Sequence, residues 1–404
     1  MTTLTLPRPA VQASATIPQP APVVRTQCGK LESKIIWIAI RLRLLYLALI
    51  TLRRPREVIR AYHHVTRLRR KMWDGKMRKL YRVGGRYFFS MYSPGWPSKQ
   101  YDETVRYELK RFALPGSSAH HVRFTFFAIT RKCPMRCEHC FEWENLNKPE
   151  SFAREELTRV VDLYQEQGNL QFQFSGGEPM VRLDDLLHLL NHARAKSECW
   201  VVTSGFNLTE ENAARLKKAG CTGVVISLDH YDPDLHNAFR GHRRAFDHAV
   251  SAIRAARKKG LVVAVSVCAT KTFLDGSHLL PYIDFVSSLG VHFIQVLEPK
   301  NVGHYQGKDV LLEERHIASI EKLFREVNSL PAYRDYPTLA YHGYHQRRIG
   351  CFSGDRSIYI DSAGNVHACP FCHTHAFNIL EWMKRGEGSL PVKENYCPRF
   401  ERIA

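Results

Sequence analysis

Three cysteines within eight residues carry the clearest chemical signal in this 404-residue chain. The run Cys133-Pro-Met-Arg-Cys137-Glu-His-Cys140 has the spacing C-x3-C-x2-C, and the next cysteine is Cys199. Clustered thiolates bind soft metals, and iron–sulfur clusters are typical partners. Three ligands for a four-iron cluster leave one iron open for chemistry. A zinc knuckle or three unrelated buried thiols are the alternatives, although zinc sites usually have four N or S ligands.

A second group of four cysteines lies near the C-terminus. Two apolar runs, 358–360 and 366–368, flank the turn Asp361-Ser-Ala-Gly364, which predicts a β-hairpin with one cysteine at each base. Such a group can hold a second iron–sulfur cluster, and a zinc site joined by His373 or His375 is the alternative. The members of this group are Cys351, Cys369, Cys372 and Cys397.

The other four of the eleven cysteines stand alone, and we expect core thiols at Cys28, Cys199, Cys221 and Cys268. Grouped cysteines with metal-ligand spacing indicate a reducing compartment rather than a secreted disulfide framework. The first 27 residues are rich in Pro, Ala and Thr and lack the apolar core of a cleavable signal peptide. We therefore expect a cytoplasmic protein whose residues 1–30 form a disordered, Pro-rich tail.

The net charge is concentrated in the N-terminal part of the chain. Residues 1–120 contain 23 Lys and Arg against six Asp and Glu, while the whole chain has a formal net charge of +19. A basic stretch can bind the phosphates of nucleic acid or of anionic lipid. Because the cysteine-bearing part is close to neutral, we do not expect nucleic acid to be the partner.

An apolar segment precedes most of these basic residues. Residues 35–52 could just span a hydrocarbon core, but Arg41 and Arg43 lie mid-run, and each costs about 2.5–3.5 kcal/mol at a bilayer centre. An interfacial helix with a polybasic continuation, together residues 31–79, fits better than a span. This pattern predicts peripheral attachment to the anionic inner face of the membrane. A helix packed against the body is the alternative.

From residue 122 onward, apolar β-branched runs alternate with amphipathic stretches such as 154–165, 183–194 and 210–219. Six βα units imply a parallel sheet with right-handed crossovers, either open or curled into a barrel. The three-cysteine loop follows the first strand, and reactive groups in such folds gather beyond the carboxyl ends of strands. The predicted strands are 124–130, 170–174, 199–203, 223–228, 261–269 and 291–297.

The remaining segments frame this core. Residues 80–92 place Gly84-Gly85 between two apolar runs and predict a hairpin, which starts a linker that includes a short helix and reaches residue 121. We expect the core to cover 122–303, a helical linker to cover 304–350, and a small cysteine-rich domain to cover 351–404.

The first strand, its C-x3-C-x2-C loop and the βα repeats resemble the radical S-adenosylmethionine (SAM) superfamily over about residues 122–303. The resemblance implies a partial (β/α)6 TIM-like barrel in which Cys133, Cys137 and Cys140 hold a 4Fe–4S cluster. It implies that the amino and carboxylate groups of SAM bind the open iron. One electron from a donor such as a flavodoxin or ferredoxin then cleaves SAM to a 5′-deoxyadenosyl radical.

The segment Ser175-Gly-Gly-Glu-Pro179 matches the family's GGEP motif, so Gly176, Gly177 and Pro179 are expected to bring backbone close to the ligand. Glu178 is expected to receive the ammonium of SAM. Helix capping is the alternative role for the short polar side chains at the strand ends. The other implied contacts are His139 and Val296 with adenine, Ser204, Ser227 and Asp229 with ribose, and Arg240 with the SAM carboxylate.

The second cysteine group resembles the auxiliary-cluster extension called SPASM or, in shorter form, twitch. The full pattern has seven cysteines for two clusters, so the four cysteines here imply one auxiliary 4Fe–4S cluster. The implied reaction removes hydrogen from an unactivated C–H bond, and the auxiliary cluster aids oxidation or cross-linking.

The sequence leaves the substrate open. Extended members of the family often modify ribosomally made peptides, whereas the apolar, basic extension favours a lipid-linked substrate. An RNA-modifying radical SAM enzyme and a non-enzymatic, membrane-associated redox scaffold are the alternatives. No catalytic acid or base is predicted.

Overall fold

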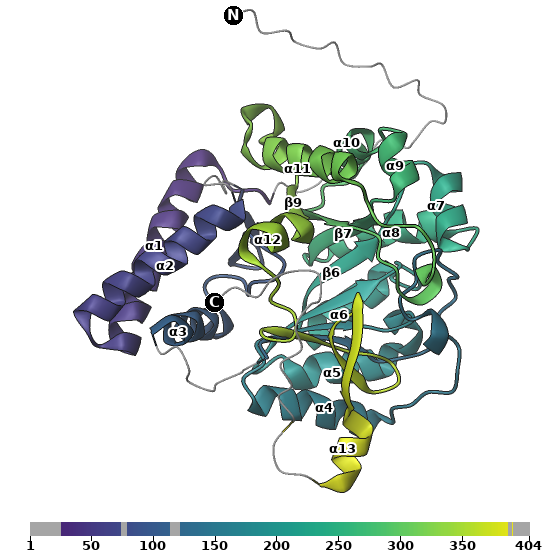
Figure 1. Ribbon diagram of the computed structural model, residues 1–404, viewed down its shortest axis with the longest axis horizontal. Helices are drawn as coiled ribbons and strands as arrows, with labels where there is room; N and C mark the ends of the chain where they lie inside the picture. Colours follow the sequence, from purple (N-terminus) through teal and green to yellow (C-terminus); the bar gives the residue numbers. More distant parts are fainter. Residues whose placement is uncertain (1–25, 74–78, 114–121, 387–389, 391–404) are drawn as a thin grey trace, which may run out of the picture.

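A ten-stranded sheet forms the centre of the molecule (Figure 1). The computed structural model describes residues 26–73, 79–113, 122–386 and 390, apart from the side chains of residues 372–375. Within this part of the chain the strand order is β12-β11-β10-β3-β4-β5-β6-β7-β8-β9. The two outermost strands of this order do not pair with each other, so the sheet forms a partial barrel.

Six parallel strands make up the middle of the sheet, as the six apolar runs predicted. Along each strand, alternate side chains point to the interior of the barrel or outward toward helices. On β4, for example, Gln171 and Gln173 face the interior, while Phe172 and Phe174 pack against the helices. The strands are β3 Phe124–Ala128, β4 Gln171–Ser175, β5 Glu198–Thr203, β6 Cys221–Ser227, β7 Val262–Cys268 and β8 Phe293–Leu297.

Strands beyond the predicted six extend the sheet at both edges. β9 (Thr338–Tyr341) adds in parallel to β8, so the expectation of a purely helical linker over 304–350 is wrong. β10 (Ser357–Ile360) adds in parallel to β3 and continues into β11 (Asn365–Cys369) and β12 (Cys372–Asn378). The predicted hairpin around Gly364 is therefore present, and it lies directly beside the strand that leads into the three-cysteine loop.

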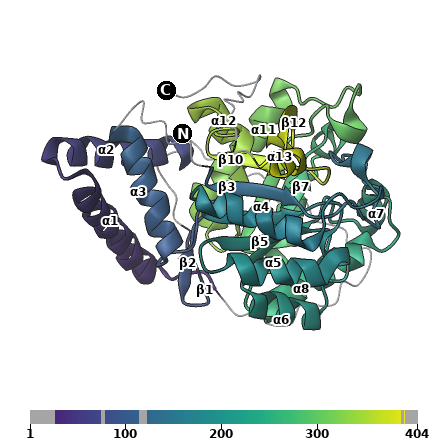
Figure 2. The ribbon, with the colours of Figure 1, turned by 90° about the horizontal axis from the view of Figure 1, so that it is seen from below.

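Helices cover the outer face of the sheet (Figure 2). Helix α6 has the predicted bounds, 210–219, because capping residues flank it. The Thr209 hydroxyl accepts a hydrogen bond from the backbone N–H of Asn212, and Gly220 ends the helix. The helices of this part of the chain are α4 Arg154–Glu166, α5 Leu183–Ala193, α6 Glu210–Ala219, α7 Pro233–Arg240, α8 Ala245–Lys258, α9 Lys271–Asp275, α10 Leu279–Ser288, α11 Glu314–Ser329, α12 His342–Ile349, which lines the interior cavity, and α13 Ile379–Arg385.

The predicted hairpin, β1 (Tyr81–Val83) and β2 (Arg86–Phe88), fills the interior of the barrel near the amino ends of its strands. Its apolar side chains and Met91 pack against inward-facing residues such as Trp200 and Phe293. This packing closes one mouth of the barrel. The interior remains open at the carboxyl ends of the strands and along the side between β10 and β9.

Three helices form a separate layer beside the sheet: α1 (Lys30–Leu52), α2 (Pro55–Trp73) and α3 (Lys99–Ala113) (Figures 1 and 2). They share a small apolar core, and α2 also packs against α12. One expectation needs correction. Residues 26–29 are ordered, with Cys28 N–H bonded to Leu80 O at 2.9 Å, while the rest of the proposed tail lies outside the described residues. Helix α2 is described as far as Trp73, and the end of the predicted helical stretch falls on residues 74–78, which lie outside the described residues.

Candidate active site

One cavity of about 650 Å³ brings most of the sequence-predicted site residues together. It begins at the three-cysteine loop, passes through the barrel and reaches helices α2 and α3. Pro179 is buried but is not among the lining residues. The Cys372 side chain and Cys397 lie outside the described residues. The predicted residues that line the cavity are Cys133, Cys137, His139, Cys140, Gly176, Gly177, Glu178, Ser204, Ser227, Asp229, Arg240, Val296, Cys351 and Cys369.

The GGEP loop holds the three-cysteine loop in place by backbone contact. Gly177 N–H donates to Thr130 O and Glu178 N–H to Lys132 O, both at 2.8 Å. A Cβ on Gly177 would lie 2.4 Å from Lys132 O, so the loops can approach only because a glycine is there. These glycines therefore serve the packing of the cysteine loop, and since both also line the cavity, their closeness to the ligand stays a prediction.

A second loop contacts the opposite side of the cysteine loop. His304 N–H donates to Cys140 O at 2.9 Å, and a Cβ on Gly303 would lie 2.3 Å from the same oxygen. The Trp143 and His304 rings stack at 3.9 Å. The backbone that carries the thiols is therefore fixed from both sides before any ligand binds.

Glu178 is fully engaged inside the protein. Its carboxylate accepts hydrogen bonds from Thr203 Oγ1 (2.7 Å), from the N–H (2.7 Å) and Oγ (2.6 Å) of Ser204, and from Met180 N–H (3.1 Å). Burial raises the pKa of Glu178, although the bonds from Ser204 and Thr203 oppose the rise. Since a carboxylate has about four acceptor positions, an ammonium can reach Glu178 only by replacing one of these donors.

Asp229 and Arg240 form a buried ion pair. Arg240 Nε donates to Asp229 Oδ2 at 2.6 Å, and Cys268 N–H donates to Asp229 Oδ1 at 2.9 Å. Burial alone would raise the pKa of Asp229, but the Arg240 charge outweighs burial and lowers it. Arg240 Nη1 also lies 3.6 Å from Cys137 Sγ. The two residues predicted to bind different parts of SAM thus contact each other, and the guanidinium contacts a cysteine sulfur.

His139 lies between Cys137 and Cys140 with one ring face on Phe239, at a centroid distance of 4.8 Å. Burial lowers the pKa of His139 to about 4, and the nearby Arg240 charge adds to the effect. The imidazole is therefore neutral at pH 7. Its Nδ1 atom is buried and has no hydrogen-bond partner in the described part of the chain. A nucleobase such as adenine, bound beside this ring, would supply a hydrogen-bond partner for Nδ1.

These observations fit a thiolate-held cluster with an adenosyl ligand. Three thiols line one end of a cavity, beside a guanidinium that can stabilise thiolate charge and a histidine with an unfilled hydrogen-bonding position. Burial raises the pKa of Cys133 to about 12, so the thiol stays protonated unless a metal binds it. Among the described residues, no three His, Cys, Asp or Glu side chains surround a single-ion position. The zinc alternative at the second cysteine group involves Cys372, His373, His375 and Cys397, whose side chains lie outside the described residues.

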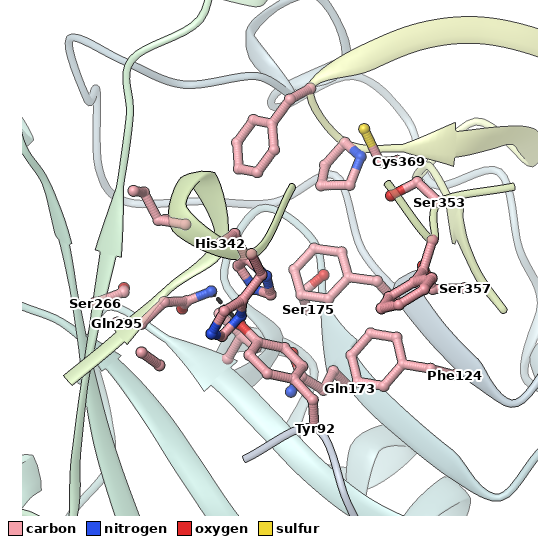
Figure 3. A pocket seen from close by; sticks show the side chains of 18 of the residues that line it. Tyr92, Phe124, Gln173, Ser175, Ser266, Gln295, His342, Ser353, Ser357 and Cys369 are labelled. Carbon is pink, nitrogen blue, oxygen red and sulfur yellow. Dashed lines mark hydrogen bonds between the residues drawn. The ribbon is translucent and has the colours of Figure 1, made fainter. Parts of the chain in front are cut away.

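A belt of polar side chains crosses the middle of the cavity and was not predicted (Figure 3). Gln295 donates to the Tyr92 hydroxyl, and Ser266 and His342 line the same region. The amide nitrogen of Gln173 is buried and has no partner among the described residues. The signal was present in the sequence of β4, QFQFS, where polar residues alternate within an otherwise apolar strand.

The second cysteine group borders the same cavity from the β10–β12 side. Cys369 ends β11 and is paired in register with Cys372, while Cys351 Sγ accepts a hydrogen bond from Gln346 at 3.3 Å. The Phe141 ring, next to Cys140, lies 5.9 Å from the ring of Phe371. One aromatic contact thus connects the two cysteine groups.

A buried carboxylate also connects these two groups. Glu142 accepts hydrogen bonds from the Tyr359 hydroxyl and from Ser362 Oγ, both on or just beyond β10. Burial raises the pKa of Glu142, although these two hydrogen bonds oppose the rise. The cysteine loop is therefore joined to the C-terminal hairpin by hydrogen bonds as well as by aromatic packing.

Comparison with known proteins agrees with this geometry. The radical SAM superfamily profile matches residues 127–277. The AdoMet-dependent heme synthase of Nitratidesulfovibrio vulgaris is 31% identical over 276 residues, which cover 62% of this chain and 74% of the relative. The GTP 3′,8-cyclase of Staphylococcus saprophyticus is 24% identical over 298 residues, which cover 68% and 86% of the two chains.

Among solved structures, SuiB of Streptococcus suis bound to S-adenosylmethionine is similar to this chain with a TM-score of 0.54 and 18% identity. The similarity covers 70% of each chain. At this level of identity it supports the partial-barrel fold.

Proposed function

This chain belongs to the radical SAM superfamily, whose members bind SAM and a 4Fe–4S cluster, and we propose that it removes hydrogen from a substrate held in the cavity. One observation carries the proposal. A single cavity is bordered by the three-cysteine loop, by the implied SAM contacts and by two cysteines of the second group. A redox scaffold would need neither the Asp229–Arg240 pair nor the enclosed space beside it.

When bound, the cluster, SAM and an auxiliary cluster supply a 5′-deoxyadenosyl radical that takes a hydrogen atom from the substrate, together with an acceptor for the second electron. Cys133, Cys137 and Cys140 would hold the first cluster, and Arg240 would stabilise its charge through Cys137. Glu178 would receive the ammonium of SAM in exchange for the Ser204 hydroxyl.

The second cysteine group supports an oxidative outcome. Cys351 and Cys369 line the cavity. The contact between Phe141 and Phe371 keeps the wall that carries these two cysteines close to the three-cysteine loop. We assign Cys351, Cys369, Cys372 and Cys397 to the auxiliary 4Fe–4S cluster. Such a cluster would supply the acceptor for the second electron of a two-electron oxidation, in which the substrate also loses a hydrogen atom and a proton.

For the substrate we favour an amphipathic, lipid-linked molecule. Beyond the three-cysteine loop, the cavity is lined by apolar residues of α2, including Leu68 and Met72, and by Phe124 of β3. A peptide is the second candidate, because the similar fold of SuiB has been solved with the precursor peptide SuiA.

Helix α1 supports a membrane location for such a substrate. Among the described helices, α1 is the one long and apolar enough to cross a membrane. Arg43 is paired with Asp102 of α3, and Leu44 and Leu47 belong to the core of the helical layer, so spanning would require α1 to detach. We propose that α1 lies on the membrane surface. Its outward stripe is formed by Leu31, Ile35, Ile38, Leu42, Leu45 and Leu49, which are 40–72% exposed.

Anaerobic reconstitution tests the reaction type. Two clusters give about eight iron atoms per chain, and reductant with SAM should yield 5′-deoxyadenosine. Replacing Cys133, Cys137 and Cys140 together by Ala should leave about four iron atoms and abolish 5′-deoxyadenosine formation. As the matched control, replacing Cys351 and Cys369 by Ala should lower the iron content but retain SAM cleavage. Fully loaded wild-type protein that cannot cleave SAM would contradict the proposal.

A further inference from the structure

Two arginines lie side by side at the amino end of β3, whereas the three-cysteine loop follows the carboxyl end of that strand. Arg123 and Arg356 immediately precede the neighbouring parallel strands β3 and β10, and Arg123 N–H donates to Arg356 O at 2.9 Å. Both side chains line the cavity, together with Glu108 of α3. We call this region the outer end of the cavity.

Within the described residues, the charges at the outer end do not balance. Arg356 pairs with Glu108 at 3.0 Å, and Arg111 pairs with Asp355 at 2.5 Å. Arg123 makes no ion pair with any carboxylate in the described part of the chain, although it is only 7% exposed. Three guanidinium groups therefore share two carboxylates.

The Arg123 guanidinium is also short of hydrogen bonds. Nη1 donates to Thr104 O at 3.4 Å, and the group lies over the Tyr107 ring. Its Nε has no partner among the described residues. Burial lowers the pKa of Arg123 to about 10, so the group remains charged at neutral pH. An unpaired buried charge is costly, and an anionic ligand would remove that cost.

We propose that Arg123 binds an anionic group, a carboxylate or a phosphate, of the substrate whose reacting carbon lies at the cysteine end of the cavity. The position of the substrate's reacting carbon rests on the proposed function. The position of its anionic group rests on the unpaired charge of Arg123. Guanidinium groups recognise both anions through paired hydrogen bonds.

The fold also sets the length of such a substrate. From Arg123 to the last residue of β3, Ala128, the strand advances by five residues, or about 16 Å at 3.3 Å per residue. The cysteine loop begins beyond that end. The walls in between include Phe124, Phe126 and Met72. The geometry thus fits an elongated, mostly apolar molecule with an anion at one end.

Binding of three ten-carbon probes to the reconstituted full-length enzyme tests this site by anaerobic calorimetry. Decanoate or decyl phosphate should bind about tenfold more tightly than 1-decanol, because only the anions can pair with the guanidinium. Whichever anion binds more tightly identifies the headgroup, and inorganic phosphate alone should bind weakly because it lacks the apolar chain. Equal affinity for all three ten-carbon probes would overturn the proposal.

Substitutions at Arg123 test whether this residue causes the preference for anionic probes. Arg123→Gln should remove the preference for anions while decanol affinity changes little, and Arg123→Lys should retain part of it. Arg106→Gln, which removes one charge from a partly exposed position of α3, is the matched control and should keep the full preference. A folded Arg123→Gln enzyme, checked by circular dichroism, that still prefers the anions would disprove the assignment. Wild-type 5′-deoxyadenosine formation without probe is measured separately, so failure of the proposed function is distinguishable.

Discussion

The two ends of the cavity differ in how their polar groups are satisfied. At the cysteine end, Asp229 and Arg240 neutralise each other, and the carboxylate of Glu178 accepts four hydrogen bonds. In the middle and at the outer end, within the described residues, the amide nitrogen of Gln173 and Nε of Arg123 have no partner. Both of these side chains are more than nine-tenths buried.

This difference separates a preorganised region from one that awaits a ligand. A buried polar group without a partner costs about 1–3 kcal/mol, so folding favours such groups only where something else offsets the cost. The cysteine end is already fixed by backbone contacts and internal pairs, as preorganised catalysis requires. Of the unfilled groups, those of Gln173 and Arg123 lie where we place the substrate, and His139 Nδ1 lies at the cysteine end, where we place the adenine of SAM. The comparison therefore predicts opposite effects of mutation in the two regions.

The largest effect is expected from Asp229→Asn. The amide can still accept the hydrogen bond from Cys268 N–H, but Arg240 loses its counter-charge while remaining buried. Breaking one side of a buried pair costs about 3–5 kcal/mol. We expect this loss in chemical denaturation of the reconstituted enzyme, together with weaker SAM binding.

The matched control for this variant is Glu210→Gln, which breaks the exposed pair with Lys258. Exposed pairs contribute about 0–1 kcal/mol, so the control should unfold almost like wild type. If Asp229→Asn were as mild as the control, the cysteine end would not be held by this pair.

A smaller, pH-dependent effect is expected at Glu298, just after β8. Burial would raise the pKa of Glu298, but Lys300, Tyr341 and Arg347 outweigh it and lower the pKa to about 2. Because the folded pKa lies below the unfolded one, the stabilisation is present above about pH 4.5 and is lost as the pH falls toward 2. It amounts to at most about 3 kcal/mol.

Denaturation at pH 6, 5, 4 and 3 measures this contribution. Wild type should lose more stability than Glu298→Gln between pH 5 and 3, so the two curves should converge on acidification. Parallel curves would show that the carboxylate is not held by its three partners.

An effect of opposite sign is expected in the middle of the cavity. Gln173→Leu removes a buried amide without a donor partner and should stabilise the protein by about 1 kcal/mol, while it weakens substrate binding. Gln171 lies two residues away on the same face of β4. Its amide nitrogen donates to Met91 O at 3.0 Å, while its Oε1 has no partner among the described residues. Gln171→Leu removes a donor that is used and leaves Met91 O unpaired, so as the matched control it should not stabilise the protein. Denaturation midpoints show whether each substitution raises or lowers the stability. A Gln173→Leu protein less stable than wild type would contradict the comparison between the two ends of the cavity.

Much of the cysteine end could be predicted from the sequence because its signals are local. The three-cysteine spacing, the GGEP run and the periodicity of six strands each lie within a short segment. The partnership of Asp229 with Arg240 was missed although both residues were recognised. Each had been matched separately to a part of SAM, and only the fold shows that α7 turns the guanidinium back onto the end of β6.

The outer end could not be predicted for a physical reason. Arg123 precedes an apolar strand and looks like an ordinary exposed residue, but α3 and β10 cover it, and β10 lies more than 230 residues further along the chain. The four residues of β9 are too few to show a period. Both features depend on pairing between distant segments, which local propensity does not encode.

The smallest effect on stability, and the last test of the comparison, concerns the outward stripe of α1. Ile38 and Leu42 are 55% and 62% exposed, so replacing both by Ser should change the free energy of unfolding by about 0.5 kcal/mol or less. If α1 lies on the membrane, the same double variant should reduce flotation with vesicles that contain phosphatidylserine by about tenfold, because two apolar side chains no longer enter the interface.

Leu235→Ser combined with Leu330→Ser is the matched control, since these residues are 52% and 46% exposed on the body of the protein. Equal flotation of the two double variants would mean that α1 does not provide the contact. Loss of flotation for the α1 variant alone would place the helical layer at the membrane, and with it the outer end of the cavity that α2 and α3 line.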